Sequence, residues 1–321
     1  MKRPEYQYAS SRAHHRYVIT PVALLLCFLA ACGERVDKQP TVIVDFEQVG
    51  SVHELPSDSS SAHPPLRVAL SAMLSPEETF SHYLDLVTYI SGRMGRKVEI
   101  KQRRSYRETN ILLEREEVDV AFVCSIVYAD LSDRGVVDLL AVPVSQGRVH
   151  YRAFILANRS QDIHTVADLK GRTFAYTDPL SFSGYAYMQY RLHTLSLAGD
   201  NFFSDVFFSH AHDHSIRLVN KGIVDAATVH SLIYDSFSAY YPEAVKNIRV
   251  IERSGYYGIP PFVTPVGTPD STKALLREIF CSMHENTRGQ AILSALGIDR
   301  FIPGNDAEYD TVREINRTVR R

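Results

Sequence analysis

The stretch Arg172–Tyr185 reads RTFAYTDPLSFSGY and joins a predicted strand to a predicted helix through a polar turn. The strand covers Arg172–Tyr176, and the helix is expected to begin near Ser183. The first turn of a helix attracts anions, because its backbone N–H groups are unpaired and the helix dipole is positive there. The hydroxyl groups of Ser181 and Ser183 add donors at the same place. Serine is also a common helix cap, and the spacing alone leaves both roles open.

Strand and helix signals alternate ahead of this stretch. Short apolar strands are predicted at Leu66–Leu70, Val98–Ile100 and Val118–Val123. Capping boxes at Ser75–Glu78 and Ser105–Glu108 predict a helix after each of the first two strands, and a short helix is expected after Ser125. Such an alternation predicts a parallel sheet covered by helices on both faces.

The second half of the chain continues the pattern. Strands are predicted at Val206–Phe208 and Asp225–Thr228, with a helix from Asp213 to Asn220 between them and Asp213 as its cap. The part from Asp270 onward is expected to be mainly helical. Chain crossings are expected at Gly147–Asn158 and Ser254–Pro261.

The N-terminus carries the features of an export signal. A basic region precedes the apolar run Tyr17–Ala31, which is too short to cross a bilayer, since that takes about 20 apolar residues. This order of features predicts a signal peptide over residues 1–31. The sequence LAACG at Leu29–Gly33 resembles the bacterial lipobox, so Cys32 is predicted to receive lipid and hold the protein at the outer face of a membrane in the cell envelope. The alternative is a short membrane anchor with an incidental cysteine.

Residues 32–65 are predicted to be a flexible tether. They lose periodicity and end in a run rich in proline and serine, a composition that does not bury enough surface to fold alone. The stretch Thr41–Phe46 is apolar enough to pack on the domain. Gly33, rather than aspartate, follows the lipid site, so the inner-membrane retention signal of enterobacteria is missing. The sequence therefore leaves the choice of membrane open.

Composition narrows the class of function. The 321 residues have a net charge of -2 and a pI near 6.7, which gives no general attraction to nucleic acid. Outside the leader, Cys124 and Cys281 either form a disulfide, which export permits, or remain as two buried thiols. There is no Gly-x-Ser-x-Gly nucleophile turn, and Trp is 0, which disfavours sugar stacking. Binding without catalysis is therefore favoured, with no catalytic residue, metal or cofactor.

The run LKGRTFAYTDPLSFSG at Leu169–Gly184 is similar to the phosphate, phosphite and phosphonate substrate-binding proteins of ABC importers. Val118–Phe122 resembles the third strand of that family, and Gly258–Val263 resembles its return segment. His212–Ile216, followed by Val224–Ala227, resembles its later helix and strand. The resemblance covers the chain from Leu66 to the C-terminus.

This resemblance implies a type II periplasmic-binding-protein fold, an α/β fold with two lobes and a ligand cleft between them. By position, lobe 1 would comprise residues 66–153 and 256–321, and lobe 2 would comprise residues 154–255. The implied partners are a small oxyanion, namely phosphate, phosphite or a phosphonate, and the permease of an ABC transporter. The lipid anchor adds the membrane itself.

The resemblance also implies which residues meet the ligand. Tyr106 and Tyr151 match family tyrosines that donate to it, although with 18 tyrosines in the chain either could be an ordinary half-buried aromatic. His212 matches a family histidine at the cleft, and Ser125 is a further candidate donor after a strand. The complete set is Tyr106, Ser125, Tyr151, Ser181, Ser183, Gly184 and His212.

The sequence departs from the family pattern in ways that bear on the ligand. Phe182 stands where the family often has threonine, which removes a hydroxyl donor. Aminophosphonate binders hold the ligand's ammonium group with acidic residues, but the matching positions here are Pro260 and a place near His230–Leu232, without an acid. An ammonium group left unpaired in a closed cleft is costly. We therefore expect phosphate, phosphite or a small alkylphosphonate rather than an aminoalkylphosphonate.

Other classes of function remain open at this point. His210, His212 and His214 alternate, and three imidazoles can hold zinc, which would suit a metal-dependent periplasmic phosphohydrolase. Against this, Asp213 as a helix cap would break the run into a strand end and a turn. A ligand-sensing lipoprotein that reports to a membrane histidine kinase is a further alternative, which the sequence does not separate from a transport protein.

Overall fold

The computed structural model describes residues 42–45, 64–197 and 201–320, all within one compact unit, Pro40–Arg321. The predicted signal peptide, the lipid site Cys32 and most of the tether lie outside the described residues. Within those residues, no helix combines the length and the apolar character needed to cross a membrane.

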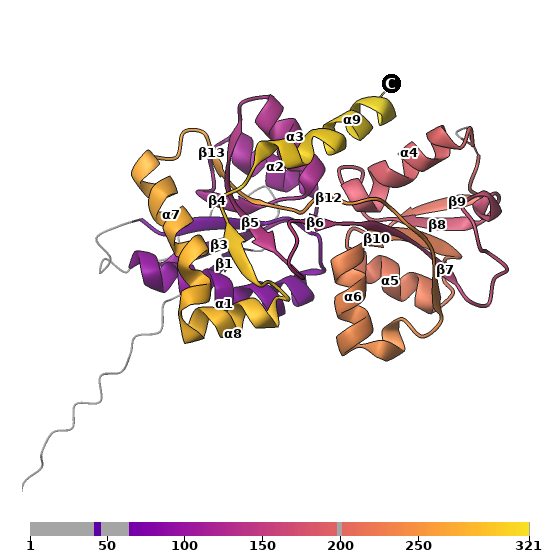
Figure 1. The fold of residues 1–321 in the computed structure, drawn as a ribbon, viewed down its shortest axis with the longest axis horizontal. Helices are drawn as coiled ribbons and strands as arrows, with labels where there is room; N and C mark the ends of the chain where they lie inside the picture. The colour runs from indigo at the N-terminus through magenta and orange to yellow at the C-terminus, as the bar shows by residue number, and fades with distance from the viewer. Residues whose placement is uncertain (1–41, 46–63, 198–200, 321) are drawn as a thin grey trace, which may run out of the picture. The chain divides into compact units, whose positions relative to one another are not determined.

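The first sheet has the strand order β1-β3-β2-β4-β13-β5-β14 (Figure 1). Its strands are β1 Val42–Asp45, β2 Leu66–Leu70, β3 Val98–Gln102, β4 Val120–Phe122, β5 Val137–Val144, β13 Phe262–Pro265 and β14 Arg300–Ile302. Strands β1, β3, β2 and β4 are parallel, whereas β13 pairs antiparallel with both β4 and β5, and β14 pairs antiparallel with β5. Within this sheet the predicted parallel arrangement is therefore correct only for the N-terminal strands, because the returning chain enters the sheet in the opposite direction.

Strand β1 comes from the predicted tether. Val42 lies opposite Val98 and Asp45 opposite Lys101, so the strand extends the sheet beyond β3. The expectation that the apolar stretch at Thr41–Phe46 packs on the domain is confirmed for Val42–Asp45, which pair with β3.

The second sheet has the order β11-β7-β10-β8-β9. Its strands are β7 Ala153–Asn158, β8 Thr173–Tyr176, β9 Asp205–Phe208, β10 Ala226–His230 and β11 Ile248–Arg253. Every residue of β7 is buried, and the strand pairs antiparallel with both β10 and β11. The prediction of a crossing segment through Asn158 is therefore wrong after Arg152, because the apolar residues that follow form a central strand.

A two-stranded ribbon connects the sheets. β6 His150–Tyr151 pairs antiparallel with β12 Tyr257–Gly258, so the chain passes twice between the sheets at this point (Figure 1). The first sheet and its helices are called lobe 1 below, and the second sheet and its helices lobe 2. The boundaries expected at 153/154 and 255/256 lie beside the ribbon.

Helices cover both sheets (Figure 1). They are α1 Pro76–Met94, α2 Tyr106–Glu114, α3 Ser125–Asp133, α4 Tyr187–Thr194, α5 His212–Asn220, α6 Ser231–Tyr240, α7 Asp270–Ser282, α8 Thr287–Ala295 and α9 Asp310–Val319. The C-terminal helix α9 packs on α3 of lobe 1 and on α4 of lobe 2. The mainly helical C-terminal part is confirmed, with the short strand β14 within it.

Local sequence signals set several helix ends. Helix α1 ends at Gly95, whose φ of 63° is the left-handed conformation that glycine adopts without steric penalty. At the start of α2, the hydroxyl of Ser105 accepts the Glu108 N–H at 3.3 Å, as the capping box predicts. The Glu108 carboxylate accepts the Arg104 N–H at 2.9 Å instead of that of Ser105. The box is thus half formed.

The two cysteines of the described domain are free thiols. Cys124 is buried at the start of α3, and Cys281 is half-buried in α7. Of the two possibilities left open by the sequence, the structure has the unpaired one.

Two helical glycines give opposite expectations for stability. A methyl group at Gly289, in the first turn of α8, would overlap the Met283 carbonyl oxygen, whereas at Gly92 in α1 it would meet open space. Gly289→Ala is expected to lower the free energy of unfolding by about 1–3 kcal/mol through overpacking. Gly92→Ala is expected to raise it by about 0.5–1 kcal/mol through helix propensity. Urea denaturation of both variants tests the pair, and equal changes would contradict the packing described for α8.

Candidate functional site

Buried hydroxyl groups without partners lie where the two lobes and the connecting ribbon meet. The Oη atoms of Tyr106 and Tyr151 and the Oγ atom of Ser183 have no hydrogen-bond partner among the described residues, and all three side chains are at most 1% exposed. An unpaired buried polar group costs about 1–3 kcal/mol, so such groups are rare in folded proteins and require an explanation. A ligand that accepts hydrogen bonds would supply the missing partners.

These hydroxyls come from different parts of the fold. Tyr106 begins α2 in lobe 1, Tyr151 lies in the connecting ribbon, and Ser183 lies in the π-helical turn Phe182–Ala186 that leads into α4 of lobe 2. Burial raises the pKa of both tyrosines well above the ordinary value, with a smaller contribution from the Cys124 thiol. Both tyrosines are therefore neutral donors at physiological pH.

The candidate residues are close enough to shift one another's pKa. Ser181 lowers the pKa of Tyr106, opposing the larger effect of burial. Ser125 and Ser183 act in the same way on Tyr151. The structure therefore brings the predicted tyrosines and serines together around one point.

The turn after β8 places the start of the helical segment Phe182–Ala186 next to these hydroxyl groups. The Oγ atom of Ser181 accepts the Gly184 N–H at 3.0 Å, so this serine does cap the helix, and its own proton remains available to a ligand. Gly184 is required because a methyl group there would overlap the Thr177 side chain. The capping role and the anion-binding role are therefore compatible.

Cys124 occupies the space between two helix starts. Its Sγ atom accepts the Phe182 N–H at 3.4 Å, and the backbone N–H groups of Ser125 and Ile126 also point to it. Burial is the main effect on this thiol, and it raises the pKa to about 11. The group is therefore uncharged and does not repel an anion.

Ser125 has a different bond from the one expected. Its Oγ atom donates to the Gly258 carbonyl oxygen at 2.6 Å. This hydrogen bond links α3 to β12 of the ribbon. Because the Ser125 proton is used in it, the hydroxyl can only accept further hydrogen bonds.

His212 lies at the start of α5 and is buried. Its Nδ1 atom accepts the His230 N–H at 3.2 Å and lies 3.1 Å from the Thr177 hydroxyl. Because it accepts a backbone N–H, Nδ1 carries no proton. Burial lowers the pKa of His212 to about 3, so the ring is neutral.

His230 is a site residue that the sequence reasoning did not propose. Its ring stacks on that of Tyr151, with centroids 4.0 Å apart and planes 20° apart. Burial and the neighbouring His212 lower its pKa well below the ordinary value, and its Nδ1 atom has no partner among the described residues. The sequence feature that could indicate His230 is its position between a strand and a helix, at the end of β10 and before α6. Ligand sites in α/β folds often lie where strands end.

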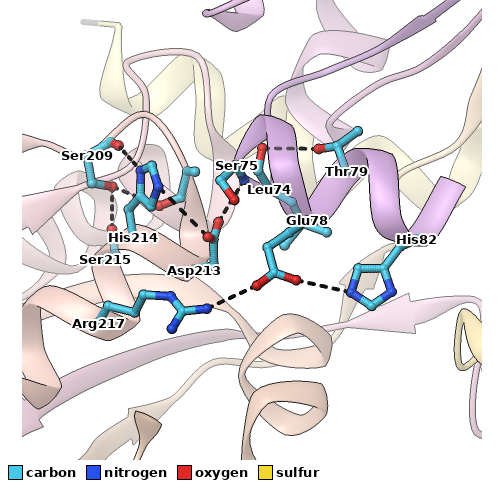
Figure 2. A network of polar contacts seen from close by, with 11 residues as sticks. Leu74, Ser75, Glu78, Thr79, His82, Ser209, Asp213, His214, Ser215 and Arg217 are labelled. Carbon is cyan, nitrogen blue, oxygen red and sulfur yellow. Dashed lines mark hydrogen bonds and ion pairs between the residues drawn. The ribbon is translucent and has the colours of Figure 1, made fainter. Parts of the chain in front are cut away.

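A carboxylate of lobe 2 reaches the start of α1 in lobe 1 (Figure 2). Asp213 is buried, and its Oδ1 atom accepts the Ser75 N–H at 2.8 Å. The prediction that Asp213 caps its own helix is wrong, because α5 begins one residue earlier and Ala211 is its cap. Its side chain caps the helix across the cleft instead.

The capping box predicted at Ser75–Glu78 is also wrong. In such a box the glutamate would accept the Ser75 N–H, but Asp213 takes that bond, and Ser75 makes no side-chain capping bond. Glu78 is left to accept from Arg217 of lobe 2 at 3.0 Å and to pair with His82 at 3.4 Å (Figure 2). The local box is replaced by contacts between lobes.

The same arrangement recurs at α2. The Tyr106 N–H lies 3.3 Å from Oδ2 of Asp178, a buried residue in the turn after β8. The Oδ1 atom of Asp178 accepts the Leu180 N–H at 2.8 Å. Two carboxylates of lobe 2 thus complete the starts of two helices of lobe 1.

The three alternating histidines do not share a site. His212 is buried, whereas His210 and His214 are exposed, and His214 lies 4.0 Å from Asp213. Within the part of the chain that the structure describes, no group of three or more His, Cys, Asp or Glu side chains is placed to hold a metal ion.

A protein family and a known relative match the sequence of this chain. The sequence profile of the family described as "ABC transporter, phosphonate, periplasmic substrate-binding protein" matches residues 68–309. The phosphonates-binding periplasmic protein of Escherichia coli (strain K12) is 24% identical over 204 residues, which are 62% of this chain. The match spans 60% of that relative's length.

Solved structures share the fold. The binding-protein component of an ABC phosphonate transporter from Pseudomonas aeruginosa has a TM-score of 0.75 at 21% identity, over 80% of this chain and 87% of that one. A Prochlorococcus marinus protein in complex with methylphosphonate has a TM-score of 0.71 at 16% identity, over 79% of this chain and 98% of that one. The predicted type II periplasmic-binding-protein fold is confirmed.

The bond from Ser75 to Asp213 gives a test of the contact between the lobes. Asp213→Ala is expected to lower the free energy of unfolding by about 1–3 kcal/mol, because it leaves the buried Ser75 N–H unpaired. Asp168→Ala is the control, since Asp168 accepts the His164 and Thr165 N–H groups within lobe 2. Urea denaturation measures both variants, and small-angle scattering shows whether the lobes separate in Asp213→Ala. Equal behaviour of the two variants would contradict the role of Asp213.

Proposed function

Because the chain belongs to the family of periplasmic substrate-binding proteins of ABC phosphonate transporters, we propose that it captures phosphate, phosphite or a phosphonate outside the cytoplasm and delivers it to an importer. The lipid on Cys32 would hold it at the membrane surface while it does so. The observation that carries the proposal is the set of buried, unpaired hydroxyls of Tyr106, Tyr151 and Ser183.

The chemistry of these groups suits a phosphoryl group. Tyrosine and serine hydroxyls donate hydrogen bonds without adding charge, and a phosphonate oxygen accepts them. The start of the turn at Ser181 adds backbone N–H groups and a helix dipole. His212 stays neutral because burial lowers its pKa to about 3, so the anion would be held by dipoles rather than by ion pairs.

Capture would be coupled to closure. Tyr106 belongs to lobe 1 and Ser183 to lobe 2, so an anion touching both is bound more tightly when the lobes meet. A ligand shifts an equilibrium only by its different contacts in the two states. The bonds from Ser75 to Asp213 and from Tyr106 to Asp178 would add to the closed state.

The expected ligand carries no ammonium group. Pro260 has no charge, and His230 is neutral because burial lowers its pKa. These residues stand at or near the positions where aminophosphonate binders have acids, so an ammonium group would lose water there without gaining a partner. Tighter binding of 2-aminoethylphosphonate than of methylphosphonate would overturn this preference.

Removing single hydroxyls tests the anion site. Tyr106→Phe and Ser183→Ala are each expected to weaken methylphosphonate binding by about tenfold to a hundredfold, the effect of a hydrogen bond to a charged group. Neither should lower the free energy of unfolding, because these hydroxyls have no partner among the described residues. Tyr89→Phe is the matched control, since the Tyr89 hydroxyl accepts the Asn286 amide at 2.6 Å within lobe 1. Unchanged affinity in both site variants would show that the ligand binds elsewhere.

Cysteine variants test the anchor. Cys32→Ser is expected to move the protein from the membrane fraction to the soluble fraction and to abolish labelling by radioactive palmitate. Cys27→Ser, which changes a cysteine inside the apolar run of the leader, is expected to leave both unchanged. Labelling that persists in Cys32→Ser would contradict the lipid site.

A further inference from the structure

A cavity of about 280 Å³ lies next to the candidate anion site. Lobe 1 contributes Leu70, Met73 and Phe122 to its wall, and α6 of lobe 2 contributes Leu232, Ile233 and Phe237. His230 lines the cavity and also stacks on Tyr151, so this ring contacts both the cavity and the group of unpaired hydroxyls. The cavity is therefore the space into which the non-phosphoryl part of a bound ligand would extend.

The size of this cavity exceeds what a phosphate ion or a methyl group requires. A dry cavity of about 150 Å³ lined by leucine, isoleucine and phenylalanine already binds benzene. At about 280 Å³ the space here accepts an aromatic ring or a chain of several carbon atoms. A bound phosphate or phosphite ion has no substituent and would leave this cavity unfilled.

The charge of the wall limits the chemistry of that substituent. No lysine or arginine lines the cavity. Its titratable groups include the imidazoles of His82 and His230 and one carboxylate, that of Asp235, which is exposed on α6. Burial of part of this carboxylate raises its pKa, and the charge of Arg253 partly offsets that effect. A charged substituent would thus lose its water to a mainly apolar surface.

Polar atoms without partners lie on the wall as well. The Oγ atom of Ser71 and the Nδ1 atom of His230 are buried and have no partner among the described residues. A neutral imidazole and a hydroxyl can each bond a hydroxyl or ether oxygen of a substituent, and neither compensates a charge. These atoms are compatible with an apolar substituent that carries one uncharged polar group.

We propose that the cleft is built for organophosphonates with an uncharged, largely apolar substituent of several carbon atoms, which occupies this cavity while the phosphonate meets the hydroxyls. The proposal rests on the proposed function and names its substrate class. It differs from the expectation of a small ligand, because the volume and the apolar wall favour a larger one.

A series of ligands tests the cavity. Titration calorimetry in phosphate-free buffer would compare methyl-, ethyl-, propyl- and phenylphosphonate with 2-aminoethylphosphonate and inorganic phosphate. Burial of each added methylene group is expected to tighten binding about threefold to fourfold. Propylphosphonate should thus bind about tenfold tighter than methylphosphonate, and phenylphosphonate at least as tightly as propylphosphonate.

Variants locate the effect. Leu232→Trp fills the cavity and is expected to bring the ratio of propyl- to methylphosphonate affinity toward one. Leu232→Asp places a carboxylate there and is expected to shift the preference from propylphosphonate toward 2-aminoethylphosphonate. Leu218→Trp is the control, because Leu218 is a half-buried leucine of α5 outside the cavity, and it should retain the wild-type ratio.

The outcomes separate the two proposals. Equal affinities for methyl- and propylphosphonate would overturn the role of the cavity and leave the proposed capture of phosphorus oxyanions standing. Failure of phosphate and all the phosphonates to bind would overturn the proposed function itself. A length dependence that persists unchanged in both Leu232 variants would place the substituent elsewhere and contradict the inference.

Discussion

The arrangement of the two lobes depends on the contact between the loop before α1 and the start of α5. The Ser75 N–H donates to Asp213, and the His212 N–H donates to the Met73 carbonyl oxygen at 3.0 Å. These bonds join adjacent residues of lobe 2 to one short loop of lobe 1. Each bond involves a backbone group at the contact between the lobes. The opposite lobe must therefore supply the partner that water would otherwise provide.

This contact explains why so much of the site is neutral. Two buried carboxylates, Asp178 and Asp213, already lie in the cleft, and each is stabilised by the start of a helix in the opposite lobe. An anionic ligand would be repelled by them unless donors stood between. The hydroxyls of Tyr106, Tyr151 and Ser183 provide such donors, and burial keeps the imidazoles uncharged so that no proton is taken up when the cleft closes.

Much of the fold could be predicted from the sequence, because the strand and helix signals are local. The strand at Leu66–Leu70, the cap at Ser105 and the turn before Ser183 each follow from a few neighbouring residues. The errors occur where a distant residue competes with a local one. Ser75–Glu78 matches a capping box in sequence, but Asp213, 138 residues away, takes the bond that Glu78 would have made.

The candidate site likewise has features that the sequence predicts and features that depend on the fold. Tyr106, Tyr151 and Ser183 could be proposed by position in the chain, but their missing partners could not, since the absence of a bond depends on every element that surrounds the atom. The resemblance implies that Ser125 is a donor to the ligand, but its bond to Gly258 depends on the return of the chain through the ribbon. His230 is difficult to predict from the sequence, because a single histidine at a strand end has no pattern of its own and its stacking on Tyr151 depends on the fold.

The cavity and the contact between lobes share their residues. Met73 lines the cavity and accepts the His212 N–H, His212 accepts the His230 N–H, and His230 stacks on Tyr151. A substituent in the cavity and a phosphonate bound to the hydroxyls would therefore contact the same set of linked residues. Both ends of one ligand would then favour the same closed arrangement, since each improves contacts that exist only when the lobes meet. Selection of the ligand and closure of the cleft would thus be parts of a single equilibrium, in which the apolar wall would contribute to closure as directly as the donors.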